Sequence, residues 1–136
     1  MNYLKAGSQW GRAAASAALH YPVSLCFGTF SRPASQWAMR RWCKTSCDWL
    51  FIDNPLIDGH KLDATPQAVI VANHLSALDI IVIGAHLRRD YRWLAKAELF
   101  KVPLSGWHLK FAGHIPVHRG DRDRNTGIGE RIHQVV

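Results

Sequence analysis

The sequence predicts an α/β protein with a partly parallel central sheet flanked by helices, preceded by a basic, amphipathic helical leader. Residues 68–72 form a short apolar run rich in β-branched side chains, which is typical of a buried parallel strand. Beyond this run, strand-like and helix-like segments alternate. Residues 1–52, in contrast, are rich in Trp and Arg. We therefore expect a membrane-associating helical leader over 1–52 and the N-terminal part of an α/β domain over 53–136.

The charge of the leader indicates an anionic partner. The chain of 136 residues has a formal net charge of +7, and its first 47 residues contain basic side chains and no acid. A helix-turn-helix, zinc-finger or RNA-recognition pattern is not evident, so no nucleic-acid partner is expected. Basic residues interleaved with Trp favour a membrane lipid surface instead. The three cysteines follow no disulfide framework, which indicates a reducing compartment.

Two segments of the leader are candidates for contact with a membrane. Residues 13–31 are uncharged and nearly long enough to span a bilayer, but His20 and Pro22 lie in the middle. This favours an interfacial or re-entrant segment, with plain core as an alternative. Residues 34–50 fit a helix with an apolar, Trp-containing face opposite Arg and Lys. We interpret it as an interfacial helix; the alternative is a helix packed on the core with a solvated basic face.

The second region is expected to alternate strands and helices after a turn-rich segment, Asn54–Pro66. The predicted order is a strand at 68–72, a helix to about Leu87, a strand at Tyr91–Ala95, short helices at Glu98–Lys101 and Leu104–Ala112, a strand at His114–His118, and a helix from Asp121 to Val136. Because the chain stops within that last helix, we expect the C-terminal part of the fold to be missing.

His74 and Asp79 are the candidate catalytic pair. His74 follows the predicted buried strand, and ligands of open α/β sheets bind beyond the carboxyl ends of strands. A histidine can accept a proton near neutral pH, and a carboxylate can orient it. Residues five apart do not share a helix face, so Asp79 must reach back from the first turn of a helix.

The alternative for this segment is a helix cap. Ser76-x-x-Asp79 matches a capping box, in which Asp79 only closes the helix and His74 is a loop residue. The sequence has no G-x-S-x-G motif and no cysteine near His74. A catalytic His74 would therefore activate a hydroxyl of the substrate.

Two further positions are candidates for binding an anion. Arg119 follows a predicted strand and precedes a glycine, where its guanidinium can bind a phosphate in bidentate fashion. Lys96 follows the preceding predicted strand and could reach a phosphate; for both residues the alternative is a solvated surface position. His114 and His118 would be about 13 Å apart on a strand, too far to share a metal, so no metal site is expected.

Three motifs occur in order: Asn73-His74-x4-Asp79, then Ala95-Lys96-Ala97-Glu98-Leu99-Phe100-Lys101-Val102-Pro103-x2-Gly106-Trp107, then Gly113-x-Ile115-Pro116-Val117-His118-Arg119. In this order and spacing the chain resembles the glycerolipid acyltransferase family, specifically the 1-acyl-sn-glycerol-3-phosphate acyltransferases, over about residues 45–136.

The resemblance implies a reaction. His74 would deprotonate the sn-2 hydroxyl of lysophosphatidic acid, and Asp79 would orient His74. The resulting oxygen would attack the thioester of acyl-CoA or acyl carrier protein, which are donor substrates; no cofactor is expected. Arg119, Lys96 and Gly113 would form the substrate-binding set, with the two cations on the acceptor's phosphate. The leader would hold the site at the cytoplasmic face of the inner membrane.

The sequence also departs from the family pattern. Leu75 stands where the family has a polar residue, Pro116 replaces an aromatic, and His118 replaces an acid or arginine, which affects the expected substrate preference. The family's downstream Glu-Gly-Thr-Arg motif does not occur here, so this chain by itself is expected to be inactive or unstable. The alternatives are an acyltransferase for another lysophospholipid or lyso-aminolipid, and an inactive fragment that binds membrane surfaces.

Overall fold

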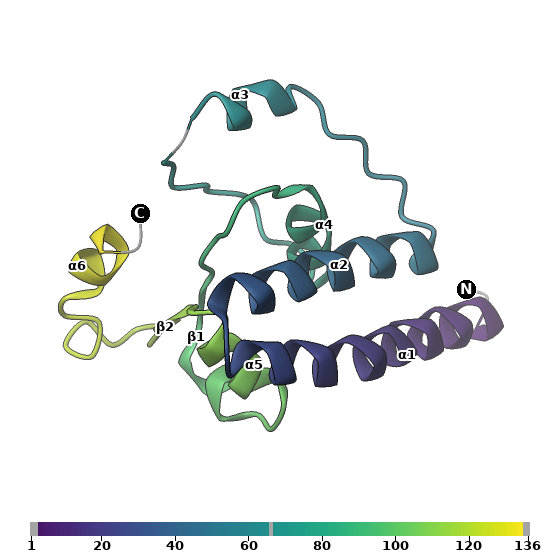
Figure 1. Cartoon of the computed structure of the whole chain (residues 1–136), viewed down its shortest axis with the longest axis horizontal. Helices are drawn as coiled ribbons and strands as arrows, with labels where there is room; N and C mark the ends of the chain where they lie inside the picture. Colours follow the sequence, from purple (N-terminus) through teal and green to yellow (C-terminus); the bar gives the residue numbers. More distant parts are fainter. Residues whose placement is uncertain (1–2, 66, 135–136) are drawn as a thin grey trace.

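Two long helices lie side by side at the start of the chain (Figure 1). The structure, a computed structural model, describes residues 3–65 and 67–134. Helix α1 spans Tyr3–Gly28 and α2 spans Arg32–Leu50. Ser31 caps α2, because its hydroxyl accepts a hydrogen bond from the Ala34 N–H at 3.4 Å. The predicted helix at 34–50 is confirmed and begins two residues earlier than expected.

The apolar face of α2 is buried inside the protein. α1 covers it from one side and α4, Leu78–His86, from the other. The side chains of this face are mostly small, and the Ser16 and Ser46 hydroxyls hydrogen-bond across the α1–α2 contact at 2.9 Å. Its buried residues are Ser35, Gln36, Ala38, Met39, Cys43, Ser46, Cys47 and Leu50. The interpretation of this face as membrane-facing is therefore wrong, and the alternative of a helix packed on the core describes it.

The uncharged stretch 13–31 lies mostly within α1. None of the helices in residues 3–65 and 67–134 is both long enough and apolar enough to cross a bilayer. Several large side chains of this stretch are nevertheless exposed, including Phe27 and Phe30. Membrane association of residues 1–52 stays a prediction.

Two short strands form a parallel sheet, as the predicted α/β class requires. β1, Leu94–Lys96, pairs in register with β2, Ile115–Val117. Between them lie the 3₁₀ helix η1, Ala97–Lys101, and helix α5, Ser105–Phe111. All four elements were predicted, with bounds that differ by at most three residues, so this β-helix-helix-β unit is confirmed.

The predicted buried strand at 68–72 is wrong. This segment is irregular in the structure, and Val69 and Val71 are 69% and 90% exposed. A strand needs a neighbour whose N–H and C=O groups complete its ladder. The described sheet contains only β1 and β2, and the run lies along neither of their free sides, so its N–H and C=O groups are without a ladder. The preceding turn-rich segment is confirmed as largely irregular, with one short helix, α3, Gly59–Asp63.

The predicted helix at 121–136 is much shorter than expected. Helix α6 spans Ile128–His133, and the residues before it form turns. Asn125 holds these turns, because its side chain accepts from the His118 N–H at 2.9 Å and donates to the His118 carbonyl at 2.6 Å. Such side-chain bonds to the backbone compete with helix formation. The last two residues of the predicted helix lie outside the described part.

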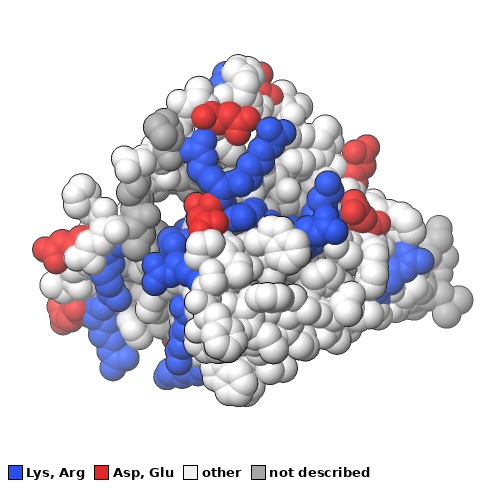
Figure 2. All heavy atoms as spheres, viewed as in Figure 1, with Lys and Arg blue, Asp and Glu red and all other residues white. Residues whose placement is uncertain are grey.

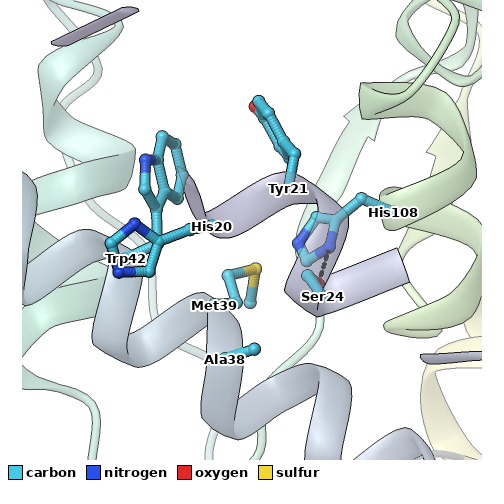
Figure 3. A pocket seen from close by; sticks show the side chains of 7 residues that line it. All are labelled: His20, Tyr21, Ser24, Ala38, Met39, Trp42 and His108. Carbon is cyan, nitrogen blue, oxygen red and sulfur yellow. Dashed lines mark hydrogen bonds between the residues drawn. The ribbon is translucent and has the colours of Figure 1, made fainter. Parts of the chain in front are cut away.

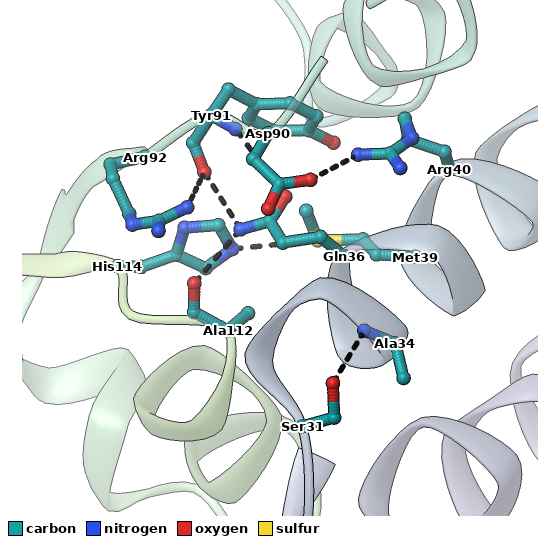
Figure 4. A network of polar contacts seen from close by, with 10 residues as sticks. All are labelled: Ser31, Ala34, Gln36, Met39, Arg40, Asp90, Tyr91, Arg92, Ala112 and His114. Carbon is teal, nitrogen blue, oxygen red and sulfur yellow. Dashed lines mark hydrogen bonds and ion pairs between the residues drawn. The ribbon is translucent and has the colours of Figure 1, made fainter. Parts of the chain in front are cut away.

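Gln36 joins the helical pair to the sheet (Figure 4). It is fully buried on α2, and its Nε2 donates to the carbonyls of Tyr91 and Ala112, each at 2.8 Å. Tyr91 precedes β1, and Ala112 follows α5. A buried carbonyl without a partner costs about 1–3 kcal/mol, so this amide fixes the sheet against α2.

Two buried histidines should make the free energy of unfolding fall in acid. Burial lowers the pKa of His108 to about 4 and that of His114 to about 3. His114 is held in its neutral form, because its Nδ1 accepts from the Trp93 N–H at 3.1 Å. In the unfolded chain a histidine takes up its proton below about pH 6.5, so the unfolded state binds more protons there and stability falls as the pH falls. Between about pH 7 and about pH 5 we expect a loss of about 2 kcal/mol per histidine.

Urea unfolding at the two pH values tests this expectation. The doubly substituted variant His108→Gln/His114→Gln should have a flatter stability–pH curve, whatever its stability at neutral pH. His60→Gln, at an exposed position, is the matched control. An unchanged slope in the double variant would show that other groups cause the acid sensitivity.

Candidate active site

Asp79 reaches back from the first turn of α4 to His74, as the spacing of the two residues required. Its Oδ2 accepts a hydrogen bond from His74 Nδ1 at 3.0 Å. The same oxygen accepts from the backbone N–H groups of Leu75 and Ser76, each at 2.9 Å. Three donors converging on one carboxylate oxygen fix the position of the loop that carries His74.

The hydrogen bonds of Asp79 determine which histidine nitrogen carries a proton. The Ser76 N–H is the largest cause that lowers the pKa of the Asp79 carboxyl, and His74 and the Leu75 N–H add to it. An ionised carboxylate only accepts hydrogen bonds, so His74 Nδ1 must be the donor. The lone pair of the neutral ring then lies on Nε2. The His74 side chain is 54% exposed, so a reacting group can approach it.

The capping alternative describes part of the same arrangement. The Asp79 bond to the Ser76 N–H is one half of a capping box. In the other half the Ser76 hydroxyl would accept from the Asp79 N–H; here it accepts from the Leu78 N–H at 3.2 Å. One carboxylate thus closes the start of α4 and orients His74, and the two interpretations do not exclude each other.

The surroundings of His74 differ from the prediction. The histidine follows the exposed, irregular run at 68–72 and not the end of a buried strand. Leu75, beside it, is 94% exposed. The position of His74 relative to Asp79 is therefore set by local hydrogen bonds and not by a sheet.

Lys96 and Arg119 lie at the carboxyl ends of the two strands. Lys96 ends β1 and pairs in register with Val117, the last residue of β2, and Arg119 follows two residues later. Both side chains are exposed, and Lys96 Nζ lies 3.9 Å from Glu98 Oε2. Within the described residues no hydrogen bond or ion pair connects either cation to His74 or Asp79. The structure thus joins His74 to Asp79 and places Lys96 and Arg119 at the carboxyl ends of neighbouring strands, without joining all four residues.

Gly113 lies at the opposite, amino-terminal end of the two strands, and its assignment to the substrate-binding set stays a prediction. It occupies the turn between α5 and β2 with φ +76°, a conformation that favours glycine. It precedes β2, whereas Arg119 follows it. Its neighbours are two arginines, Arg32 and Arg92, which the sequence did not single out because only the fold brings them together.

The cavity between α1, α2 and α5 is too small for a substrate (Figure 3). Its volume is about 10 Å³, close to the space that one water molecule occupies. His108 Nδ1 is hydrogen-bonded to the Ser24 hydroxyl here. The cavity is lined by His20, Tyr21, Ser24, Ala38, Met39, Trp42 and His108. No group of three or more His, Cys, Asp or Glu side chains among residues 3–65 and 67–134 is arranged to hold a metal ion.

Comparison with known proteins identifies the family. The acyltransferase family model matches residues 55–136, which include His74, Asp79, Lys96 and Arg119. The chain belongs to the acyltransferase family. It is 31% identical over 103 residues to a 1-acyl-sn-glycerol-3-phosphate acyltransferase of Chlamydomonas reinhardtii, covering 74% of this chain and 30% of that protein. The chloroplastic enzyme BAT2 of the same description from Brassica napus is 28% identical over 117 residues, covering 85% of this chain and 33% of that protein.

A third relative has a different acceptor in its name. The lyso-ornithine lipid O-acyltransferase of Pseudomonas aeruginosa is 37% identical over 67 residues, covering 47% of this chain and 25% of that protein. This acyltransferase chain spans about a third or less of the length of these curated relatives. No solved structure matches it.

Proposed function

We propose that this acyltransferase chain supplies the general base for transfer of an acyl group from acyl-CoA or acyl carrier protein to the sn-2 hydroxyl of lysophosphatidic acid. The observation that carries the proposal is the His74–Asp79 hydrogen bond, in which an ionised Asp79 accepts from Nδ1 and leaves the Nε2 lone pair for a substrate. The family model that covers both residues, and relatives named for acylation of 1-acyl-sn-glycerol 3-phosphate, support it.

In the proposed reaction, His74 Nε2 takes the proton of the acceptor hydroxyl as its oxygen attacks the thioester carbonyl. The carbon–sulfur bond then breaks, and the imidazolium returns the proton to the leaving thiolate. The products are phosphatidic acid and the free thiol of the donor. Asp79 stays ionised and stabilises the imidazolium.

Arg119 and Lys96 hold the acceptor's phosphate in this proposal. They lie at the carboxyl ends of β1 and β2, where α/β proteins commonly bind ligands. Glu98 Oε2 lies 3.9 Å from Lys96 Nζ and compensates part of the lysine's charge. Arg119 is therefore the stronger phosphate ligand. The reaction takes place at the cytoplasmic face of the inner membrane, which the net charge of +7 favours.

A second acceptor class is a lyso-aminolipid. The Pseudomonas relative, named for lyso-ornithine lipid, favours this class. The two classes differ at the headgroup, since only lysophosphatidic acid carries a phosphate monoester for Arg119 to bind.

Acyl transfer in detergent micelles tests the proposed function. The assay follows a radiolabelled acyl-CoA with lysophosphatidic acid or lyso-ornithine lipid, using this chain and a longer form that includes the family's Glu-Gly-Thr-Arg motif. We expect transfer to lysophosphatidic acid by the longer form. Transfer only to lyso-ornithine lipid would select the second acceptor class. Failure with every lysolipid, together with binding to vesicles, would favour an inactive membrane-binding fragment.

A further inference from the structure

Two arginines from distant parts of the sequence meet at Gly113. Arg32 is the first residue of α2, and Arg92 lies two residues before β1. The Nε atoms of Arg92 and Arg32 lie 3.1 Å and 3.2 Å from the point that a Cβ on Gly113 would occupy. The missing side chain of Gly113 thus leaves room for both arginine side chains to approach one point.

Neither guanidinium is paired with a carboxylate in the described part of the chain. The Arg32 side chain makes no hydrogen bond or ion pair there, and Arg92 Nη1 donates only to the adjacent Tyr91 carbonyl at 3.0 Å. Arg92 Nε is buried without a hydrogen-bond partner. The acid that acts on Arg92 is Asp90, which is engaged in an ion pair with Arg40 at 2.8 Å (Figure 4).

The two positive charges repel each other and present unused donors. Burial is the largest cause that lowers the pKa of Arg92, and the charge of Arg32 adds to it. An oxyanion between the two arginines would reduce the repulsion and accept hydrogen bonds from both guanidinium groups. A phosphate group is the anion whose charge and oxygens suit two guanidinium groups best.

This pair is separate from the phosphate site of the proposed acyl transfer. β1 and β2 are parallel, and Arg92 and Gly113 both precede them, whereas Lys96 and Arg119 lie at or beyond their carboxyl ends. A group held by Arg32 and Arg92 therefore lies at the amino-terminal ends of the strands. The cations assigned to the acceptor's phosphate lie at the carboxyl ends.

An open apolar groove adjoins the arginine pair. It is lined by Leu25, Cys26, Thr29, Phe30, Trp107 and Phe111. Phe30 lies two residues before Arg32, and Phe111 lies two residues before Gly113, so the groove borders the pair at the start of α2 and just after the end of α5. Phe30 is 90% exposed. In Figure 2 the surface over α1 and α5 is largely uncharged, with Lys and Arg gathered beside it.

We propose that this surface binds an anionic phospholipid of the bilayer, with the headgroup phosphate between Arg32 and Arg92 and an acyl chain along the groove. Charge complementarity and the adjoining apolar wall together select an amphiphile over a soluble phosphate. The site anchors the chain through the α1–α2 turn and α5, and not through the buried face of α2.

Vesicle binding by the 136-residue chain tests the site without any acyl-transfer substrate. The chain is titrated with phosphatidylcholine vesicles with and without phosphatidylglycerol. We expect Arg32→Gln/Arg92→Gln to weaken binding to the anionic vesicles about 30-fold, as two basic residues at such a surface contribute. Arg41→Gln/Lys44→Gln removes the same charge from exposed positions of α2 and should weaken it less than about threefold. Equal losses in the two variants would overturn the site in favour of net charge alone.

A second measurement does not depend on the arginine variants' folding. Brominated phosphatidylglycerol quenches tryptophans that contact its chains, and Trp107 lines the groove. We expect Trp107→Phe to remove most of the quenching and Trp10→Phe, 76% exposed on α1, to leave it. Quenching that follows Trp10 would overturn the proposed surface. Arginine-dependent binding of inorganic phosphate, with vesicle binding unchanged, would show that the ligand is a soluble phosphate and overturn the lipid.

Discussion

Replacing His74 with alanine should lower the rate of acyl transfer by about 10²–10⁴-fold, the usual contribution of a positioned proton-transfer group. Asp79 is a poor substitute for this base, because hydrogen bonds from the Ser76 N–H, His74 and the Leu75 N–H lower the pKa of its carboxyl. The loss should fall on kcat, since the structure places no acceptor-binding cation in contact with His74. The measurement is kcat and KM with acyl-CoA and lysophosphatidic acid, using the longer form.

His74→Asn separates chemistry from structure at this position. An asparagine amide can donate to Asp79 as His74 Nδ1 does, but it has no lone pair that accepts a proton near neutral pH. The variant should therefore keep the loop and lose the activity. His60→Ala, at an exposed histidine of α3, controls for removal of an imidazole. Near wild-type kcat in His74→Asn would show that His74 is only a loop residue.

Local features of the fold could be predicted from the sequence because local forces produce them. The His74–Asp79 contact needs only a helix start between the two residues, and the structure has one at Leu78. The helix at 34–50 followed from the spacing of its apolar residues. β1 and β2 followed from apolar segments separated by short helical ones, a connection long enough for the parallel pairing that the structure has.

Contacts between distant segments could not be predicted in this way. The periodicity of α2 shows that one face is apolar but not which elements cover it. In the structure, α1 and α4 cover this face. The run at 68–72 has the composition of a buried strand, yet burial of a strand depends on partners elsewhere. The resemblance implies one substrate-binding set for Gly113 and Arg119, but β2 lies between them and places them at opposite ends of the strand. Arg32 and Arg92 are 60 positions apart, so no local pattern joins them.

The substitution Asp79→Asn should lower kcat by about 10–10²-fold although it changes only one atom of the side chain. All three donors converge on Asp79 Oδ2, so an asparagine carbonyl in its place can still accept from His74 Nδ1 and from the Leu75 and Ser76 N–H groups. The variant therefore keeps the loop and the proton on Nδ1. It lacks the negative charge that stabilises the imidazolium formed when Nε2 takes the acceptor's proton.

Imidazole ¹⁵N chemical shifts, measured beside kcat, distinguish this electrostatic role from a merely structural one. In the wild-type chain and in Asp79→Asn the His74 signals should report a proton on Nδ1, whereas kcat should fall in the variant. A residue that is only a cap would leave kcat unchanged, because the asparagine keeps the bonds to the Leu75 and Ser76 N–H groups. Asp48→Asn, at an exposed carboxylate of α2, is the matched control and should change neither the tautomer nor kcat. An unchanged kcat in Asp79→Asn would reduce Asp79 to a helix cap, and the proposed mechanism would fail with it.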